Sequence, residues 1–144
     1  MKFKSEVEIA KSMDELIVLI QDPENTLKWL DGLRSVKHIS GELRQAGAIS
    51  KVVFDSPAGR LHITETVISN ELPHEYIIRY DGIGYTSYSN YTFQELSDGL
   101  TRFTMLQQVE LKGALKLAGG LVKGKMSRQL SISAEGFKRF AENQ

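Results

Sequence analysis

The sequence of 144 residues contains no cysteine, only three prolines and a single tryptophan. The absence of cysteine excludes disulfide bonds, thiolate catalysis and cysteine-ligated metal centres, and it suits a reducing compartment. No apolar run approaches the roughly 20 residues that a membrane-spanning helix requires. The N-terminal stretch MKFKSEVEIA alternates charged and apolar residues, whereas a signal peptide carries an apolar run. We therefore expect a cytoplasmic protein without stable membrane insertion.

The sequence also lacks an excess of charge of either sign. Eighteen basic and eighteen acidic residues give a formal net charge of zero, so no overall field attracts nucleic acid, and we expect no nucleic-acid partner. The three histidines, His38, His62 and His74, show no metal-ligand spacing. We therefore expect neither a metal site nor a cofactor.

Length and composition favour one folded unit. With 144 residues, of which 41% are hydrophobic, the chain is long enough to build one substantial core. We expect a single domain over residues 1–144, present as a monomer or a homodimer.

The first thirty residues predict one strand and two short helices. Phe3, Val7 and Ile9 alternate with charged residues, which indicates a half-buried strand. Ser12 to Glu15 fits a capping box, so a helix is expected to begin near Met13. Asp22 and Pro23 provide a second N-cap and first helical position. A second short helix should follow and carry Leu27, Trp29 and Leu30.

Residues 34–111 predict a series of strands without intervening helices. Turn signals recur at short intervals, at Gly41 to Gly47, Asp55 to Gly59, Asn70 to Pro73, Asp81 to Gly84 and Ser97 to Gly99. Connections this short cannot carry the crossovers of a parallel sheet. The pattern therefore predicts an antiparallel meander.

The segment Gly113 to Ala141 has the period of one long helix. Its apolar stripe recurs every three or four residues, at Leu115, Ala118, Val122, Met126, Leu130, Ala134, Phe137 and Phe140. Glycines interrupt it, and each interior glycine costs on the order of 1 kcal/mol relative to alanine. We expect the stretch Gly119 to Gly124 to be bent, loose or partly unwound.

Three local patterns, in this order, carry a family resemblance. They are Asn25 to Val36 with its Trp29-Leu30-Asp31-Gly32-Leu33 core, the strand, turn and strand of Val67 to Tyr76, and the hairpin Asp98 to Phe103. Together with the order of elements over the whole chain, they resemble the START-like superfamily (SRPBCC), specifically its polyketide cyclase/dehydrase-type members. The resemblance implies an α+β helix-grip fold. It would have a seven-stranded curved antiparallel sheet, two short helices after strand one, and a long C-terminal helix over an internal cavity.

Alternation within the strands predicts which side chains face that cavity. One strand contributes Leu61, Ile63, Glu65 and Val67, and the last contributes Phe103, Met105, Gln107, Val109 and Leu111. The register of Tyr85 to Phe93 is open because Tyr88 lies on the opposite face. In the strand around residues 48–54, either of two sets could face inward: Ala48, Ser50, Val52 and Phe54, or Ile49, Lys51 and Val53.

The predicted inner surface is apolar with a few polar atoms, as a small-molecule pocket requires. The residues expected to contact a ligand are Tyr76, Ile78, Tyr80, Tyr85, Phe103, Met105, Gln107, Met126 and Leu130. The favoured function is a carrier or sensor for a small hydrophobic or amphipathic molecule, such as a lipid, polyketide or aromatic compound. Two alternatives stay open: a cyclase or dehydratase-like enzyme acting on an aromatic substrate, and a regulatory protein-interaction module whose core is filled.

Glu65 is the single candidate for catalysis. On a cavity wall its pKa would rise through desolvation, and the carboxyl could act as a general acid or base. A register shifted by one residue would instead place Glu65 in water and Thr64 and Thr66 inside. The sequence favours this second alternative, because an unpaired buried charge is costly and no partner for it is evident.

Two further patterns have conventional interpretations. Gly119 to Met126 resembles a phosphate-binding P-loop, but Met126 stands where a hydroxyl is required, and no buried strand precedes it. The basic residues between Lys112 and Arg139 allow transient contact with an anionic membrane. An ordinary solvated helix face is favoured there, because the first half of the segment has no Trp or Phe anchor.

Overall fold

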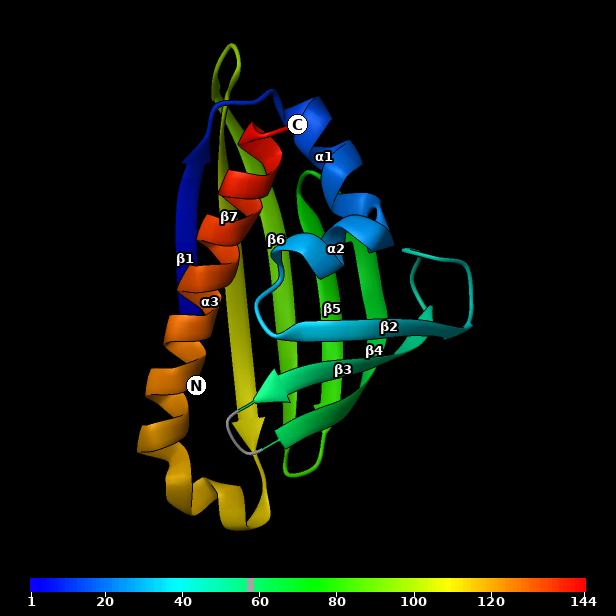
Figure 1. The fold of residues 1–144 in the computed structure, drawn as a ribbon, viewed down its shortest axis with the longest axis vertical. Helices are drawn as coiled ribbons and strands as arrows, with labels where there is room; N and C mark the ends of the chain where they lie inside the picture. Colours follow the sequence, from blue (N-terminus) through cyan, green and yellow to red (C-terminus); the bar gives the residue numbers. More distant parts are fainter. Residues whose placement is uncertain (57–58) are drawn as a thin grey trace.

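The strands of the protein form one antiparallel sheet, and the helices lie on its concave side (Figure 1). The computed structural model describes residues 1–56 and 59–144, so the expected turn at Asp55 to Gly59 lies partly outside the described residues. The strands are β1 (Lys2–Ile9), β2 (Leu33–Ser40), β3 (Ile49–Ser56), β4 (Gly59–Glu71), β5 (Glu75–Gly82), β6 (Tyr85–Ser97) and β7 (Leu100–Leu111). Their spatial order is β1-β7-β6-β5-β4-β3-β2.

The first strand thus pairs with the last, and the remaining strands follow one another as a meander. The α-helices are α1 (Met13–Gln21), α2 (Pro23–Trp29) and α3 (Gly119–Glu142), and a 3-10 helix, η1 (Gly113–Ala118), precedes α3. This arrangement confirms the expected α+β fold with a seven-stranded antiparallel sheet, two short helices after the first strand and a long C-terminal helix.

The two short helices begin where the sequence indicated. The hydroxyl of Ser12 accepts a hydrogen bond from the Glu15 amide at 3.3 Å, and Asp22 accepts one from the Glu24 amide at 3.0 Å. Each cap satisfies an amide that has no partner within its helix. Pro23 occupies the first turn of α2, where its missing N–H costs nothing. Together, α1 and α2 cover the upper end of the sheet in Figure 1.

The C-terminal helix corrects one expectation. The stretch Gly119 to Gly124 is regular α-helix, and the irregular segment lies one turn earlier, in η1. Glycine readily adopts helical dihedrals, and its cost is entropic, so glycines alone do not unwind a helix that is held at its other end. The chain turns instead at Gly113, whose φ of +59° is left-handed. The P-loop-like residues are therefore the first turns of α3.

The structure shows which side chains of β3 and β6 face inward, a point that the sequence left open. In β3 the buried set is the one containing Ser50 and Val52, and in β6 Tyr91 and Phe93 are buried while Tyr88 is exposed. The sequence predicts that Leu61 faces inward, but it is 39% exposed, because it lies near the start of β4.

A cluster of aromatic rings fills one end of the space between α3 and the sheet. Phe137 of α3 lies with its ring centroid 4.7 Å from that of Phe103 and 5.0 Å from that of Trp29. Tyr91 and Phe93 complete the cluster from β6. Edge-to-face and tilted pairs of this kind add about 0.5–1.5 kcal/mol each beyond the area they bury. The second half of α3 is therefore firmly seated on the sheet.

Among the described residues, no helix is both long enough and apolar enough to cross a membrane.

Gly136 marks the closest approach between α2 and α3. A Cβ built on Gly136 would lie 2.7 Å from the carbonyl oxygen of Trp29, whereas a Cβ on Gly124 would meet no atom within 4 Å. Both glycines are interior to the same helix, so they form a matched pair.

We predict that Gly124→Ala raises the melting temperature by about 3 °C, because alanine gains about 1 kcal/mol over glycine in a helix. Gly136→Ala gains the same propensity but must push α3 away from Trp29, at a cost of about 1–3 kcal/mol. Its melting temperature should fall below that of the wild type. Thermal unfolding followed by circular dichroism measures both, and equal increases for the two variants would contradict the close contact.

Candidate ligand-binding site

A row of polar side chains crosses the concave face of the sheet. Ser50, Glu65, Tyr80 and Ser87 stand directly opposite one another on the neighbouring strands β3, β4, β5 and β6. Residues opposite each other in an antiparallel pair share one face, so all four side chains are on the inner side. The amide of Gln107 on β7 extends this row by donating a hydrogen bond to the Ser87 hydroxyl at 3.0 Å.

Glu65 lies on the inner face, which corrects the expectation that it faces water. Its neighbours at two-residue spacing, Ile63 and Val67, are 5% and 4% exposed, while Thr64 bonds to the exposed Lys51 on the other face. Burial raises the pKa of the Glu65 carboxyl above its ordinary value of 4.5, and the charge of Arg44 and the hydroxyl of Tyr80 offset part of that rise. Burial therefore shifts the balance of this carboxyl toward its protonated form relative to a carboxyl in water.

Arg44 is a candidate functional residue that the sequence analysis missed. It lies in the connection between β2 and β3, and its guanidinium turns inward to donate hydrogen bonds to the Tyr76 hydroxyl at 3.0 Å and the Thr26 hydroxyl at 2.9 Å. Its carbonyl oxygen accepts a bond from Asn70 at 2.8 Å. These contacts hold Arg44 at a φ of +65°, in the left-handed region that residues other than glycine rarely adopt.

The guanidinium of Arg44 has one further hydrogen-bond donor, its Nε. This atom is buried and has no hydrogen-bond partner within residues 1–56 and 59–144. A buried, unpaired donor on a charged group is costly, so such a group is a candidate for contact with a bound molecule. No periodic signal in the sequence points to Arg44, because it belongs to no strand or helix.

Three tyrosines surround these charges. Burial raises the pKa of Tyr76, Tyr80 and Tyr91, so their phenols stay protonated at neutral pH and can both donate and accept hydrogen bonds. The ring of Tyr80 packs edge-on against Phe54, with centroids 6.3 Å apart. The polar atoms are thus held between rings that exclude water.

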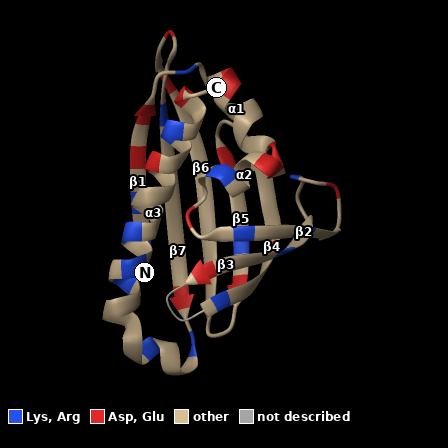
Figure 2. Ribbon diagram, in the orientation of Figure 1, with Lys and Arg blue, Asp and Glu red and all other residues tan. Residues whose placement is uncertain are grey.

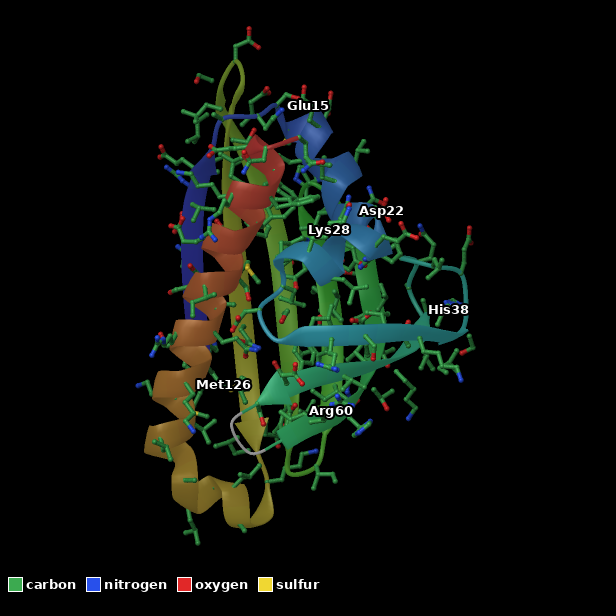
Figure 3. All side chains as sticks on the ribbon, in the orientation of Figure 1. Glu15, Asp22, Lys28, His38, Arg60 and Met126 are labelled. Carbon is green, nitrogen blue, oxygen red and sulfur yellow. The ribbon has the colours of Figure 1, made fainter. Side chains whose placement is uncertain are left out.

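The predicted ligand contacts differ in their surroundings. Six of them are buried: Tyr76, Ile78, Tyr80, Phe103, Met105 and Leu130. Three are half-buried: Tyr85, Gln107 and Met126. Phe103 belongs to the aromatic cluster at the filled end, whereas Met126 lies on the first half of α3, level with β3 (Figure 3). The sheet brings Tyr76, Tyr80, Gln107 and Glu65 onto one face, and Arg44 reaches Tyr76 there from the β2–β3 connection. The predicted set of ligand contacts lacked Arg44 and Glu65.

A groove at the surface lies away from the polar row. This groove, of about 580 Å³, lies between the end of α2 with the loop after it and the second half of α3. Its walls include Leu27, Lys28, Arg139 and Phe140, and the polar row is not among them. The cavity that the sequence analysis expects between the sheet and α3 stays a prediction.

The arrangement can hold an apolar molecule that carries an oxygen function. Arg44 offers a cationic donor, the tyrosines offer neutral hydroxyls, and Glu65 can accept or give a proton. Apolar walls with a few fixed polar groups are typical of small-molecule sites. Within the described part of the chain, no three His, Asp or Glu side chains are placed to hold a metal ion.

Solved structures with the same fold come from several organisms. The Zhui aromatase/cyclase from Streptomyces sp. R1128 superposes with a TM-score of 0.87, at 10% identity, over 99% of this chain and 94% of that one. TTHA0849 from Thermus thermophilus gives a TM-score of 0.82, at 15% identity, over 98% and 97% of the two chains. Protein BH1534 of Bacillus halodurans gives 0.72, at 18% identity, over 99% and 97%.

At these identities the structural matches establish the fold alone, the START-like helix-grip fold that the sequence analysis expected. No curated protein sequence matches the chain. A family model does, and it covers residues 1–142. The chain therefore belongs to the family described as polyketide cyclase / dehydrase and lipid transport.

Proposed function

We propose that the protein binds a small hydrophobic or amphipathic molecule, such as a lipid, a polyketide or an aromatic compound, between the concave sheet and α3, and acts as its carrier or sensor. The observation that carries the proposal is a group of polar side chains on the inner side of the sheet, in which the partly buried Arg44 and Glu65 lie beside the buried Tyr76 and Tyr80. A face that served packing alone would gain nothing from two partly buried ionisable groups, each of which costs free energy to desolvate in its charged form.

The position of α3 supports the same proposal. Its second half is fixed by the aromatic cluster around Phe137, while side chains of its first half, such as Met126, are only partly covered. A helix fixed at one end can move slightly at the other without breaking the core. The apolar part of a ligand would lie against Met126 and Met105, and its oxygen function would point toward Arg44.

A second candidate is catalysis of the cyclase or dehydratase type, and Glu65 favours it. Its pKa is raised, which is the direction that suits a carboxyl that takes or gives a proton in catalysis. Arg44 would polarise a substrate carbonyl, and Tyr80, which stands opposite Glu65, would orient it. The two candidates differ in turnover, because a carrier releases its ligand unchanged. Glu65→Gln should abolish turnover in an enzyme and leave the bound molecule unaltered in a carrier.

We predict that gently purified protein carries a stoichiometric small molecule, which native mass spectrometry detects and solvent extraction releases. Met126→Trp should fill the space beside the sheet and lower the bound fraction at least tenfold. Ser131→Trp is the matched control, because Ser131 is exposed on the same helix, and it should keep the ligand.

Both variants should melt within a few degrees of the wild type, which separates loss of binding from loss of fold. A wild-type protein that is empty and takes up none of a panel of fluorescent fatty acids and aromatic dyes would refute the proposal. Equal binding by Met126→Trp and Ser131→Trp would refute the site.

We also predict a pH-dependent stability difference between the wild type and Glu65→Gln. Because burial raises the pKa of Glu65 in the folded state, the folded protein binds more protons than the unfolded chain above pH 4.5. The wild type should therefore lose stability as pH rises from about 4.5 toward the raised pKa, by about 1.4 kcal/mol per unit of difference. Glutamine resembles the neutral acid and lacks this loss.

Urea unfolding at several pH values between 4 and 7 tests this prediction. The free energies of unfolding of the two proteins should be close at the acid end, and the variant should become the more stable one as pH rises. A constant difference over the whole range would show that Glu65 is solvated.

A further inference from the structure

Three aliphatic side chains protrude at one end of the molecule. Ile83, Leu117 and Leu121 are 96%, 93% and 67% exposed, and among the described large hydrophobic residues only Val18 is comparably exposed, at 71%. Single exposed apolar residues are ordinary, but several that lie together mark an interaction surface.

The three side chains belong to segments that are joined. The amide of Lys112, just before η1, donates a hydrogen bond to the Gly84 carbonyl at 2.7 Å, which fixes the β5–β6 turn beside η1. Leu115 of η1 packs directly on Gly84, since a Cβ there would lie 2.6 Å from its side chain. The turn, η1 and the start of α3 therefore form one end of the molecule, opposite α1 (Figure 1).

In the helical part of this end, all charged residues are basic. From residue 111 to residue 134 the sequence has five basic residues and no acidic one: Lys112, Lys116, Lys123, Lys125 and Arg128. Figure 2 shows these basic positions along η1 and the first half of α3. The nearest acidic residues in the sequence are Glu110, at the end of β7, and Glu135, in the second half of α3. The carboxylate of Asp81, in the strand before the β5–β6 turn, is paired with Arg79 at 2.9 Å.

We propose that this end, defined by Ile83, Leu117, Leu121 and the lysines 112, 116, 123 and 125, docks reversibly on an anionic lipid bilayer. Aliphatic tips surrounded by lysines suit the boundary between acyl chains and headgroups. A protein partner is normally held by aromatic and arginine anchors in pockets, and this end has no aromatic side chain among its protruding residues. The sequence analysis found no aromatic anchor here, and the exposed aliphatic tips supply the apolar contact instead.

The proposal stands apart from the proposed ligand site, because it uses no residue of the polar row. The test is flotation of the full-length protein with vesicles of phosphatidylcholine, with and without phosphatidylglycerol, at low and high salt. We expect binding only to the vesicles that contain phosphatidylglycerol, and release at high salt, because screening weakens attraction to surface charge.

Two pairs of variants test the two parts of the surface. Lys116→Gln with Lys123→Gln should weaken partitioning about 25-fold, roughly fivefold per charge, whereas the exposed control pair Lys37→Gln with Lys51→Gln should not. Leu117→Ser with Leu121→Ser should lower partitioning at least tenfold. Its control is Val18→Ser with Leu43→Ser, at exposed apolar positions elsewhere.

Absence of binding to anionic vesicles at low salt would overturn the proposal, and so would equal losses in the test and control pairs. Loss in the lysine pair without loss in the leucine pair would also overturn it, because adsorption by charge alone does not need this surface. All substitutions are at exposed positions, so the melting temperature should stay close to that of the wild type and confirm that folding is intact.

Discussion

The contact between the second half of α3 and the sheet supports the rest of the structure. Phe137 meets Phe103 and Trp29 in one cluster, so the helix, the sheet and α2 are joined at a single point. Gly136 permits the approach by leaving room for the Trp29 carbonyl. Because aromatic rings fix this end, α3 stays attached to the sheet although the side chains of its first half are less buried.

The concave face thus has two parts, the end filled with aromatic rings and the polar row. A packed core accepts Phe103 and Phe137 with a gain in free energy, whereas Arg44 and Glu65 can only cost free energy unless their charges are compensated. The compensation comes from hydroxyls and from the attraction between the two charges. Keeping Arg44 in a left-handed conformation adds strain, and strain of this kind concentrates where a molecule is bound.

The first half of α3 has two sides with different proposed roles. Met126 is half-buried, whereas Leu117 and Leu121 just before it are open to solvent beside the lysines. A bilayer that holds these tips would bring the lipid surface next to the less tightly packed part of the helix. Under these two proposals an apolar molecule would reach the ligand site from the bilayer, in line with a family described by both polyketide cyclase and lipid transport.

The sequence by itself determined the order of elements, the helix starts at Ser12 and Asp22, and the inner face of the last strand, because caps and two-residue alternation are local signals. It also carried the family resemblance. Tertiary structure decided the rest. The charge that offsets that of Glu65 belongs to Arg44, about twenty positions away in a connection without periodicity. No local pattern in the sequence could therefore show that the charge of Glu65 is compensated. The exposure of Leu117 likewise depends on where η1 departs from the helical period, which is fixed by its packing on the β5–β6 turn rather than by its own residues.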